Sequence, residues 1–255
     1  MQLTRMRTAL WLTLKALVRR RIVVLLVFII PTLFTALILL TTADLPVRFL
    51  LASVGEGLSV EVPQRDEGLV FVGIVAVGVL TAFLALDLAQ RDAEVSRRLL
   101  VCGYRPGELI AARLGVLLLV IVSISAYTIA IVRVFLVPER TVSLALGFAA
   151  TGWVYGCYGL MVGAAFRREL EGILFVVLLA NIDAGWLQNP LYYAEAHNQA
   201  IIRSLPAYFP AQASITAAFT THSTIVPMLA SFAYGIALLL LAAAIYVLRV
   251  RAGRA

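Results

Sequence analysis

Very few residues of this sequence have side chains that could carry out catalysis or bind a metal. The only two histidines, His197 and His222, fall in one stretch near the carboxyl terminus, together with Glu195. With Glu195 or Asp183 they could form a metal or acid–base site, because imidazole and carboxylate groups bind metals and transfer protons. Isolated polar residues in a stretch of this kind are more often simply hydrated. We therefore expect no metal site and keep the histidine site as an alternative.

The motifs of the common hydrolytic enzymes are absent from the sequence. It contains no Gly-x-x-x-x-Gly-Lys-Ser/Thr phosphate loop, no Gly-x-Ser-x-Gly turn and no His-Glu-x-x-His pair. The two cysteines, Cys102 and Cys157, are too few for a disulfide framework or a thiolate metal site. We therefore expect no catalytic residue, no bound cofactor and no ATP hydrolysis by this chain alone.

The segments that must position any functional residue are long and apolar. Hydrophobic residues make up 62% of the sequence and charged residues only 14%, whereas soluble domains contain about 25% charged residues. A span of about 20 apolar residues crosses the roughly 30 Å hydrocarbon core of a bilayer. The pattern predicts an all-α, polytopic membrane protein, a single domain over residues 1–255 with six transmembrane helices at residues 22–41, 68–86, 114–137, 142–166, 172–187 and 226–248.

The positive charges predict the orientation of these helices. Sixteen of the 21 Lys and Arg residues lie before the first helix, after the second, after the fourth or after the sixth. Positively charged loops remain in the cytoplasm, so we expect both termini to be cytoplasmic. The net charge of +7 is explained by these flanking residues, and we expect no binding to nucleic acid.

The first 21 residues predict a helix that lies on the membrane surface. Leu3, Met6, Leu10, Leu14 and Leu17 recur at spacings of three and four, which places them on one helical face. Such an amphipathic helix lies in the interface of the inner leaflet. The apolar run that follows is too long for a secretory signal, so we expect an uncleaved first span.

The loop of residues 87–113 is charged and yet patterned. Val95, Leu99 and Cys102 share one helical face, and Gly103 is a suitable helix end. A tight turn at Arg105-Pro106-Gly107 follows, after which Glu108 begins the next long helix. The pattern favours a short amphipathic docking helix at the inner surface over a plain solvated connector.

The fourth span contains regularly spaced glycines. Glycines at spacings of four, three and four place Gly152, Gly156, Gly159 and Gly163 on one face of the fourth span, where small residues allow close helix packing. A partner helix in the same chain is favoured over one in another subunit.

Three prolines, Pro190, Pro206 and Pro210, divide the outer segment of residues 188–225, and Pro227 follows it. The pattern predicts two short helices near residues 191–204 and 211–221 that dip into the outer leaflet as a re-entrant segment. Asn181 and Asp183, just before it, are interpreted as capping or solvated residues at the rim, with lining of a pathway or contact with the proline-rich segment as the alternatives.

These features resemble the permease subunits of type-2 ABC exporters across nearly the whole chain. The closest local matches are the run from Glu94 to Arg113, EVSRRLLVCGYRPGELIAAR, and the stretch Leu205-Pro206-Ala207-Tyr208-Phe209-Pro210 before the last span. The run from Glu94 is similar to the family's acidic residue, leucine pair, glycine-bearing turn and basic residue before span 3. The stretch from Leu205 is similar to the family's proline-bearing segment before span 6.

The resemblance implies a separate ATPase subunit that carries ATP and Mg²⁺, and a second permease copy or paralogue, in the bacterial inner membrane. It implies that residues 91–107 are the coupling helix, with Leu99 and Leu100 as apolar anchors and Arg97, Arg98 and Arg105 paired with acidic groups. The coupling residues expected on this basis are Arg91, Glu94, Arg97, Arg98, Leu99, Leu100, Gly103, Tyr104, Arg105, Pro106 and Glu108.

The resemblance also assigns the outer segment to a cap near the export route, carried by Asp183, Pro206, Tyr208, Phe209 and Pro210. The first outer loop, residues 42–67, is short for the family, which favours a small amphiphilic substrate such as a drug, an antibiotic or a lipid. Two alternatives remain: a membrane-embedded enzyme that uses His197, His222 and Asp183, and a membrane anchor or immunity protein that transports nothing.

Overall fold

The computed structural model describes residues 2–51, 59–91, 106–166 and 168–252. Within these residues the chain is mostly helical, and six helices are long and apolar enough to cross a membrane. This is the arrangement of a multi-pass membrane protein, as the hydropathy pattern predicts. The six are α2 (Arg21–Thr41), α3 (Gln64–Arg91), α5 (Pro106–Phe135), α6 (Thr141–Ala165), α7 (Glu169–Ile182) with its continuation η1 (Asp183–Leu187), and α11 (Ile225–Ala252).

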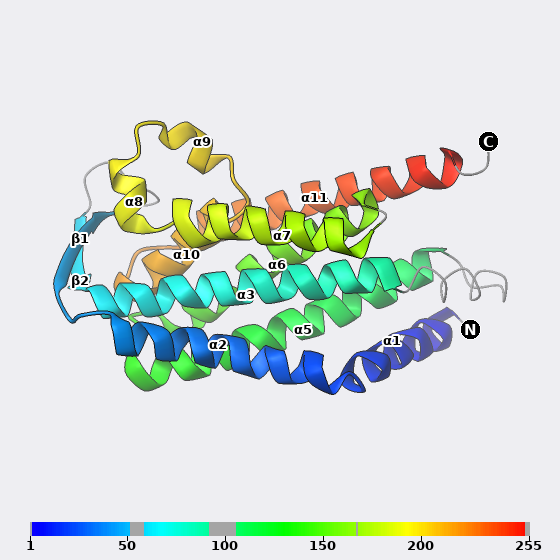
Figure 1. Cartoon of the computed structure of the whole chain (residues 1–255), viewed down its shortest axis with the longest axis horizontal. Helices are drawn as coiled ribbons and strands as arrows, with labels where there is room; N and C mark the ends of the chain where they lie inside the picture. Colours follow the sequence, from blue (N-terminus) through cyan, green and yellow to red (C-terminus); the bar gives the residue numbers. More distant parts are fainter. Residues whose placement is uncertain (1, 52–58, 92–105, 167, 253–255) are drawn as a thin grey trace.

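The long helices lie side by side along the longest axis of the molecule (Figure 1). The first turn of α1 (Gln2–Val18), the last turn of α11 and the ends of α3 and α5 that flank residues 92–105 all lie at the right of the view (Figure 1). We call this the terminal end. The opposite end, at the left of Figure 1, holds a β-hairpin, and we call it the hairpin end. Arg-rich and Arg-poor connections therefore alternate between the two ends, as the charge pattern predicts.

The amino-terminal helix α1 packs against the terminal end of α5. The described members of its apolar face are Leu10, Leu14 and Leu17, which lie in or against the hydrophobic core. Trp11 is exposed, and the Lys15 ammonium lies 4.5 Å from the centroid of its ring. The predicted amphipathic helix is therefore present. Its position in the plane of the membrane stays a prediction.

Helices α3 and α6 form the centre of the bundle, and the glycine face of α6 lies at this centre. A Cβ atom on Gly159 would lie 2.2 Å from the carbonyl oxygen of Ala82 in α3, and one on Gly163 would also meet α3. Gly152 and Gly156 face side chains of α5. Both neighbours belong to the same chain, and the missing side chains are what allow the helix axes to approach so closely.

Among the described residues, the all-α prediction misses a β-hairpin at the hairpin end. Strands β1 (Pro46–Leu50) and β2 (Ser59–Pro63) pair antiparallel, with Arg48 opposite Glu61. The buried Phe49 ring packs edge-on against Phe219, with 6.1 Å between ring centroids. Exposed Arg48 followed by buried Phe49 is the two-residue alternation of a strand, but five residues are too short a run to stand out beside the long helices.

The outer segment folds into three short helices, not two. The predicted helix over residues 191–204 is interrupted by a turn at residues 196–198, which separates α8 (Pro190–Glu195) from α9 (Gln199–Arg203). The third helix, α10 (Tyr208–Phe219), begins three residues before the predicted start at residue 211. Pro210 is its third residue, and a proline in the first turn removes no helical hydrogen bond.

Candidate functional site

The most unusual local geometry in the bundle occurs where α7 ends. The amide of Gln188 donates to the carbonyl of Asp183, 3.1 Å away and five residues earlier, so the last turn is a π-helix. Single π-turns inside α-helices occur frequently at functional sites. This turn directs Asp183 and Ala184 into the bundle and leaves Trp186 on the outside.

The Asp183 side chain is completely buried and accepts three hydrogen bonds. Its Oδ2 atom accepts from the Tyr155 hydroxyl of α6 at 2.7 Å and from the Ala207 amide at 2.8 Å. Its Oδ1 atom accepts from Nε2 of Gln188 at 2.9 Å. All three contacts are donors, which suits a carboxylate because it offers acceptors only. One side chain therefore joins α6, η1 and the residue that precedes α10.

The site lies deep within the bundle and not at its rim. Tyr155 is about 21 Å from the start of α6 at Thr141, at 1.5 Å per residue, and α6 has 25 residues in all. Asp183 is likewise about 21 Å from the start of α7 at Glu169. The solvated-rim interpretation of Asp183 is therefore wrong for its side chain. Contact with the proline-rich segment, one of the alternatives, is confirmed by the bond from the Ala207 amide, and pathway lining stays a prediction.

The chain before α10 leads into the bundle, and α10 runs from there back to the hairpin end. Its carboxyl end is joined to the α5–α6 connection, because the amides of Glu139 and Arg140 donate to the carbonyls of Ala218 and Ala217 at 3.0 Å. Its amino end lies at the depth of Tyr155 through the bond from Ala207 to Asp183. The chain therefore turns back within the bundle, and we call α10 the re-entrant helix for this course, while its place in a membrane stays a prediction.

The surroundings of Asp183 contain polar groups but, among the residues that the structure describes, no ion-pair partner. Tyr155 and Tyr158 of α6 pack edge to face with 6.1 Å between ring centroids. The Oε1 atom of Gln188 is buried and has no hydrogen-bond partner. The positive end of the α10 dipole faces the Asp183 carboxylate, so the arrangement is that of a helix cap supplied by a distant residue.

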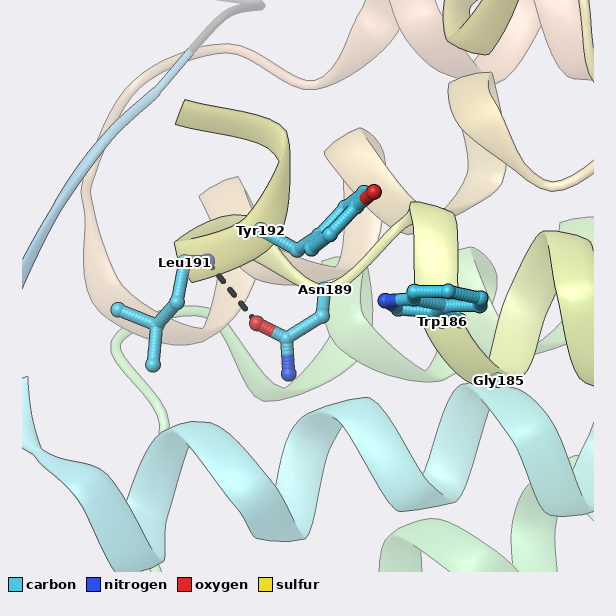
Figure 2. A pocket seen from close by; sticks show the side chains of 5 residues that line it. All are labelled: Gly185, Trp186, Asn189, Leu191 and Tyr192. Atoms are coloured by element: carbon cyan, nitrogen blue, oxygen red, sulfur yellow. Dashed lines mark hydrogen bonds between the residues drawn. The ribbon is translucent and has the colours of Figure 1, made fainter. Parts of the chain in front are cut away.

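An open recess of about 360 Å³ lies on the other side of the π-turn (Figure 2). It is lined by Gly185 and Trp186 of η1 and by Asn189, Leu191 and Tyr192 at the start of α8. The exposed rings of Trp186 and Tyr192 lie 5.3 Å apart between centroids, and Oδ1 of Asn189 accepts from the Leu191 amide to cap α8 (Figure 2). Aromatic side chains with a polar edge exposed to water are typical of the membrane interface.

The structure brings together only part of the predicted outer site. Pro206, Tyr208 and Pro210 are buried at or just before the start of α10, and the residue of this segment that bonds to Asp183 is Ala207. Phe209 is half-buried, and its ring packs edge to face against Tyr208, 5.2 Å away between centroids. The sequence did not reveal Tyr155 and Gln188, although a tyrosine pair three residues apart in a glycine-rich span is a signal for a polar contact inside a membrane.

The remaining candidates lie elsewhere or outside the described residues. Arg91 ends α3, and Pro106 and Glu108 lie in the first turn of α5, while the rest of the predicted coupling helix falls in residues 92–105 and lies outside the residues described here. His197 and His222 are exposed, and Asp183 makes none of its hydrogen bonds with them. The described residues contain no group of three His, Cys, Asp or Glu side chains that could hold a metal.

Comparison with known proteins adds no assignment to this geometry. No family model matches the sequence, and no curated protein matches it significantly. The function must therefore be argued from the arrangement of the bundle and from the resemblance in its local motifs.

Proposed function

We propose that this chain is the permease subunit of an ATP-driven exporter of the type-2 ABC class, and that it moves a small amphiphile across the bacterial inner membrane. A separate nucleotide-binding subunit supplies ATP hydrolysis with Mg²⁺. A second permease, identical or paralogous, completes the pathway.

The observation that carries the proposal is the burial of α3, the helix that residues 92–105 follow in the sequence. The segment continues directly from α3, whose membrane-spanning part is the most buried of the six. Helix α3 packs against α2, α5, α6 and α7. A force applied to this basic, amphipathic segment would therefore act on the helix that contacts most of the others, and closely packed interiors transmit such displacements with little loss.

The two ends of the bundle also differ in the way that an exporter requires. The terminal end presents the Arg-rich connections, which suit a cytoplasmic partner with acidic groups. The β-hairpin, α8 and α9 lie toward the hairpin end (Figure 1), and the carboxyl end of the re-entrant α10 is bonded to the α5–α6 connection there, which suits a gate on the exit side. Energy for opening would come from the different contacts of the ATPase with two states of the permease.

The interaction with an ATPase is tested by co-purification. The tagged chain is expressed with a candidate phosphate-loop ATPase from a neighbouring reading frame, and the ATPase that elutes with the tag is quantified. We expect Leu99→Asp to abolish co-elution, because it places a charge on the apolar face of the coupling segment, and Leu99→Met to preserve it. Equal co-elution of the ATPase with all three chains, or with none, would overturn the coupling role.

A further inference from the structure

The two ends of α10 are held by different kinds of contact. At its carboxyl end, two backbone hydrogen bonds from the α5–α6 connection and the Phe49–Phe219 ring pair fix the helix to the hairpin end. At its amino end, Asp183 holds the Ala207 amide, and the Tyr234 hydroxyl of α11 donates to the Ser204 carbonyl at 2.9 Å. The deep end thus depends on side-chain hydrogen bonds.

Many of the side chains on α10 are small. The helix is almost completely buried, yet its buried residues include Ala211, Ala213, Ser214, Ala217 and Ala218. The middle of α10 packs closely on α6, because a Cβ on Gly147 would lie 3.0 Å from the Cα of Ser214. Small residues allow such close packing of helices. The directional restraints at the deep end are hydrogen bonds: Asp183 accepts from the Tyr155 hydroxyl and the Ala207 amide, and Tyr234 donates to the Ser204 carbonyl.

We propose that Asp183 is a latch that positions the deep end of the re-entrant helix, and that this end, before the contact of Ser214 with Gly147, moves when the latch opens. The role in transport rests on the proposed function: release of the deep end would open a route between α3, α6 and α11, the helices against which α10 packs. Asp183 is then a positioning residue, because it acts on the route through α10.

The geometry predicts which substitutions break the latch. Asp183→Ala removes the acceptor of three donors. Asp183→Asn keeps one oxygen in the place of Oδ2 for Tyr155 and Ala207, and rotation of the Gln188 amide brings its unpartnered Oε1 atom to the new NH₂ group. The latch therefore depends on the acceptor oxygen, and the amide should restore it.

The test measures the access of a thiol reagent to α10 in membranes that contain the full chain. Gln212 lies in α10 and is 4% exposed, so Gln212→Cys is the reporter, in a background in which Cys102→Ala and Cys157→Ala remove the native thiols. Thr81→Cys, at a fully buried position of α3, is the matched control reporter for opening of the whole bundle. The rate of N-ethylmaleimide labelling is measured at both positions.

We expect Asp183→Ala to raise the labelling rate at position 212 about tenfold or more, since hydrogen bonds to a charged group are among the strongest in proteins. The rate at position 81 should not change. Asp183→Asn should restore the slow rate, and Tyr155→Phe should give an intermediate one. Tyr158→Phe is the matched control on the same helix, because its hydroxyl donates to the Phe175 carbonyl and not to Asp183, and it should have no effect.

Two results would overturn the latch. If Asp183→Ala leaves labelling at position 212 unchanged, Asp183 does not hold α10. If it raises labelling equally at positions 81 and 212, the carboxylate supports the whole bundle and α10 is not a separate unit. The experiment needs neither an ATPase nor a substrate, so its failure is distinguishable from failure of the proposed function.

Discussion

The α3–α6 interface and the deep end of α10 lie close together in one bundle, but they are held by opposite means. At the first, a glycine of α6 contacts the backbone of α3 so closely that no side chain fits between them. At the second, a polar side chain bridges three elements and is the main directional contact. Steric packing between backbones resists any displacement, whereas hydrogen bonds can be exchanged. The comparison suggests a rigid centre beside a helix whose deep end can be released.

The largest effect is expected at the rigid centre. Gly159→Leu would place a side chain where a Cβ already lies 2.2 Å from the Ala82 carbonyl oxygen, so α3 and α6 must separate. Because overpacking costs about 1–3 kcal/mol or more even where side chains can move, we expect little folded protein, measured as the monodisperse fraction in size-exclusion chromatography in detergent. Gly185→Ala is the control, since its Cβ meets nothing closer than 3.6 Å. A folded, monodisperse Gly159→Leu protein would refute the rigid centre.

A smaller effect is expected when the latch is removed. Asp183→Ala leaves the Tyr155 hydroxyl and the Ala207 amide buried without an acceptor, and each unsatisfied group costs about 1–3 kcal/mol. The protein should fold, with an apparent melting temperature below that of the parent, and Asp183→Asn should recover most of the loss. Thermal unfolding followed by tryptophan fluorescence measures both. Equal destabilisation by Ala and Asn would show that the charge matters more than the acceptor geometry.

A third substitution tests the contact between the centre and α11. The Trp153 indole stacks on Phe232 at 5.3 Å between ring centroids and donates to its carbonyl at 3.2 Å. A Cβ on Gly235 would lie 2.1 Å from Nε1 of Trp153. Because a side chain can rotate where a backbone cannot, Gly235→Ala should cost about 1–3 kcal/mol, less than Gly159→Leu. A shift in the Trp153 emission maximum would report the displaced ring, and an unchanged spectrum would argue against the contact.

The smallest effect is expected on the exposed face of the hairpin. Arg48 and Glu61 are cross-strand partners, and both are exposed. Exposed pairs of opposite charge contribute about 0.2–1 kcal/mol, so Arg48→Ala should lower the melting temperature only slightly. A large loss of stability would mean that the hairpin, and not the bundle, limits unfolding.

The sequence predicted the parts of the fold that depend on local pattern. Long apolar runs indicated the six spans, and the spacing of Leu10, Leu14 and Leu17 indicated the buried face of α1. Strands of five residues were missed because so short an alternation has little weight beside helical runs. The break between α8 and α9 was missed because it depends on a local turn and not on hydropathy.

The candidate site was predictable only in part, because its members come from different helices. Asp183 and Pro206 were identified from sequence, but the contacts of Asp183 with Tyr155 and Ala207 span 28 and 24 residues. No periodicity within one helix reports which residue of another will face it. The assignment of residues 92–105 to coupling remains a prediction, because it depends on a partner chain.

ATP-dependent transport by the assembled complex tests the central claim most directly. Inside-out vesicles that contain the permease and its ATPase are supplied with a fluorescent amphiphile, with and without ATP and Mg²⁺. We predict ATP-dependent accumulation that Leu99→Asp abolishes and Leu99→Met retains. No accumulation with ATP from vesicles in which the ATPase is bound and hydrolyses ATP would contradict the account.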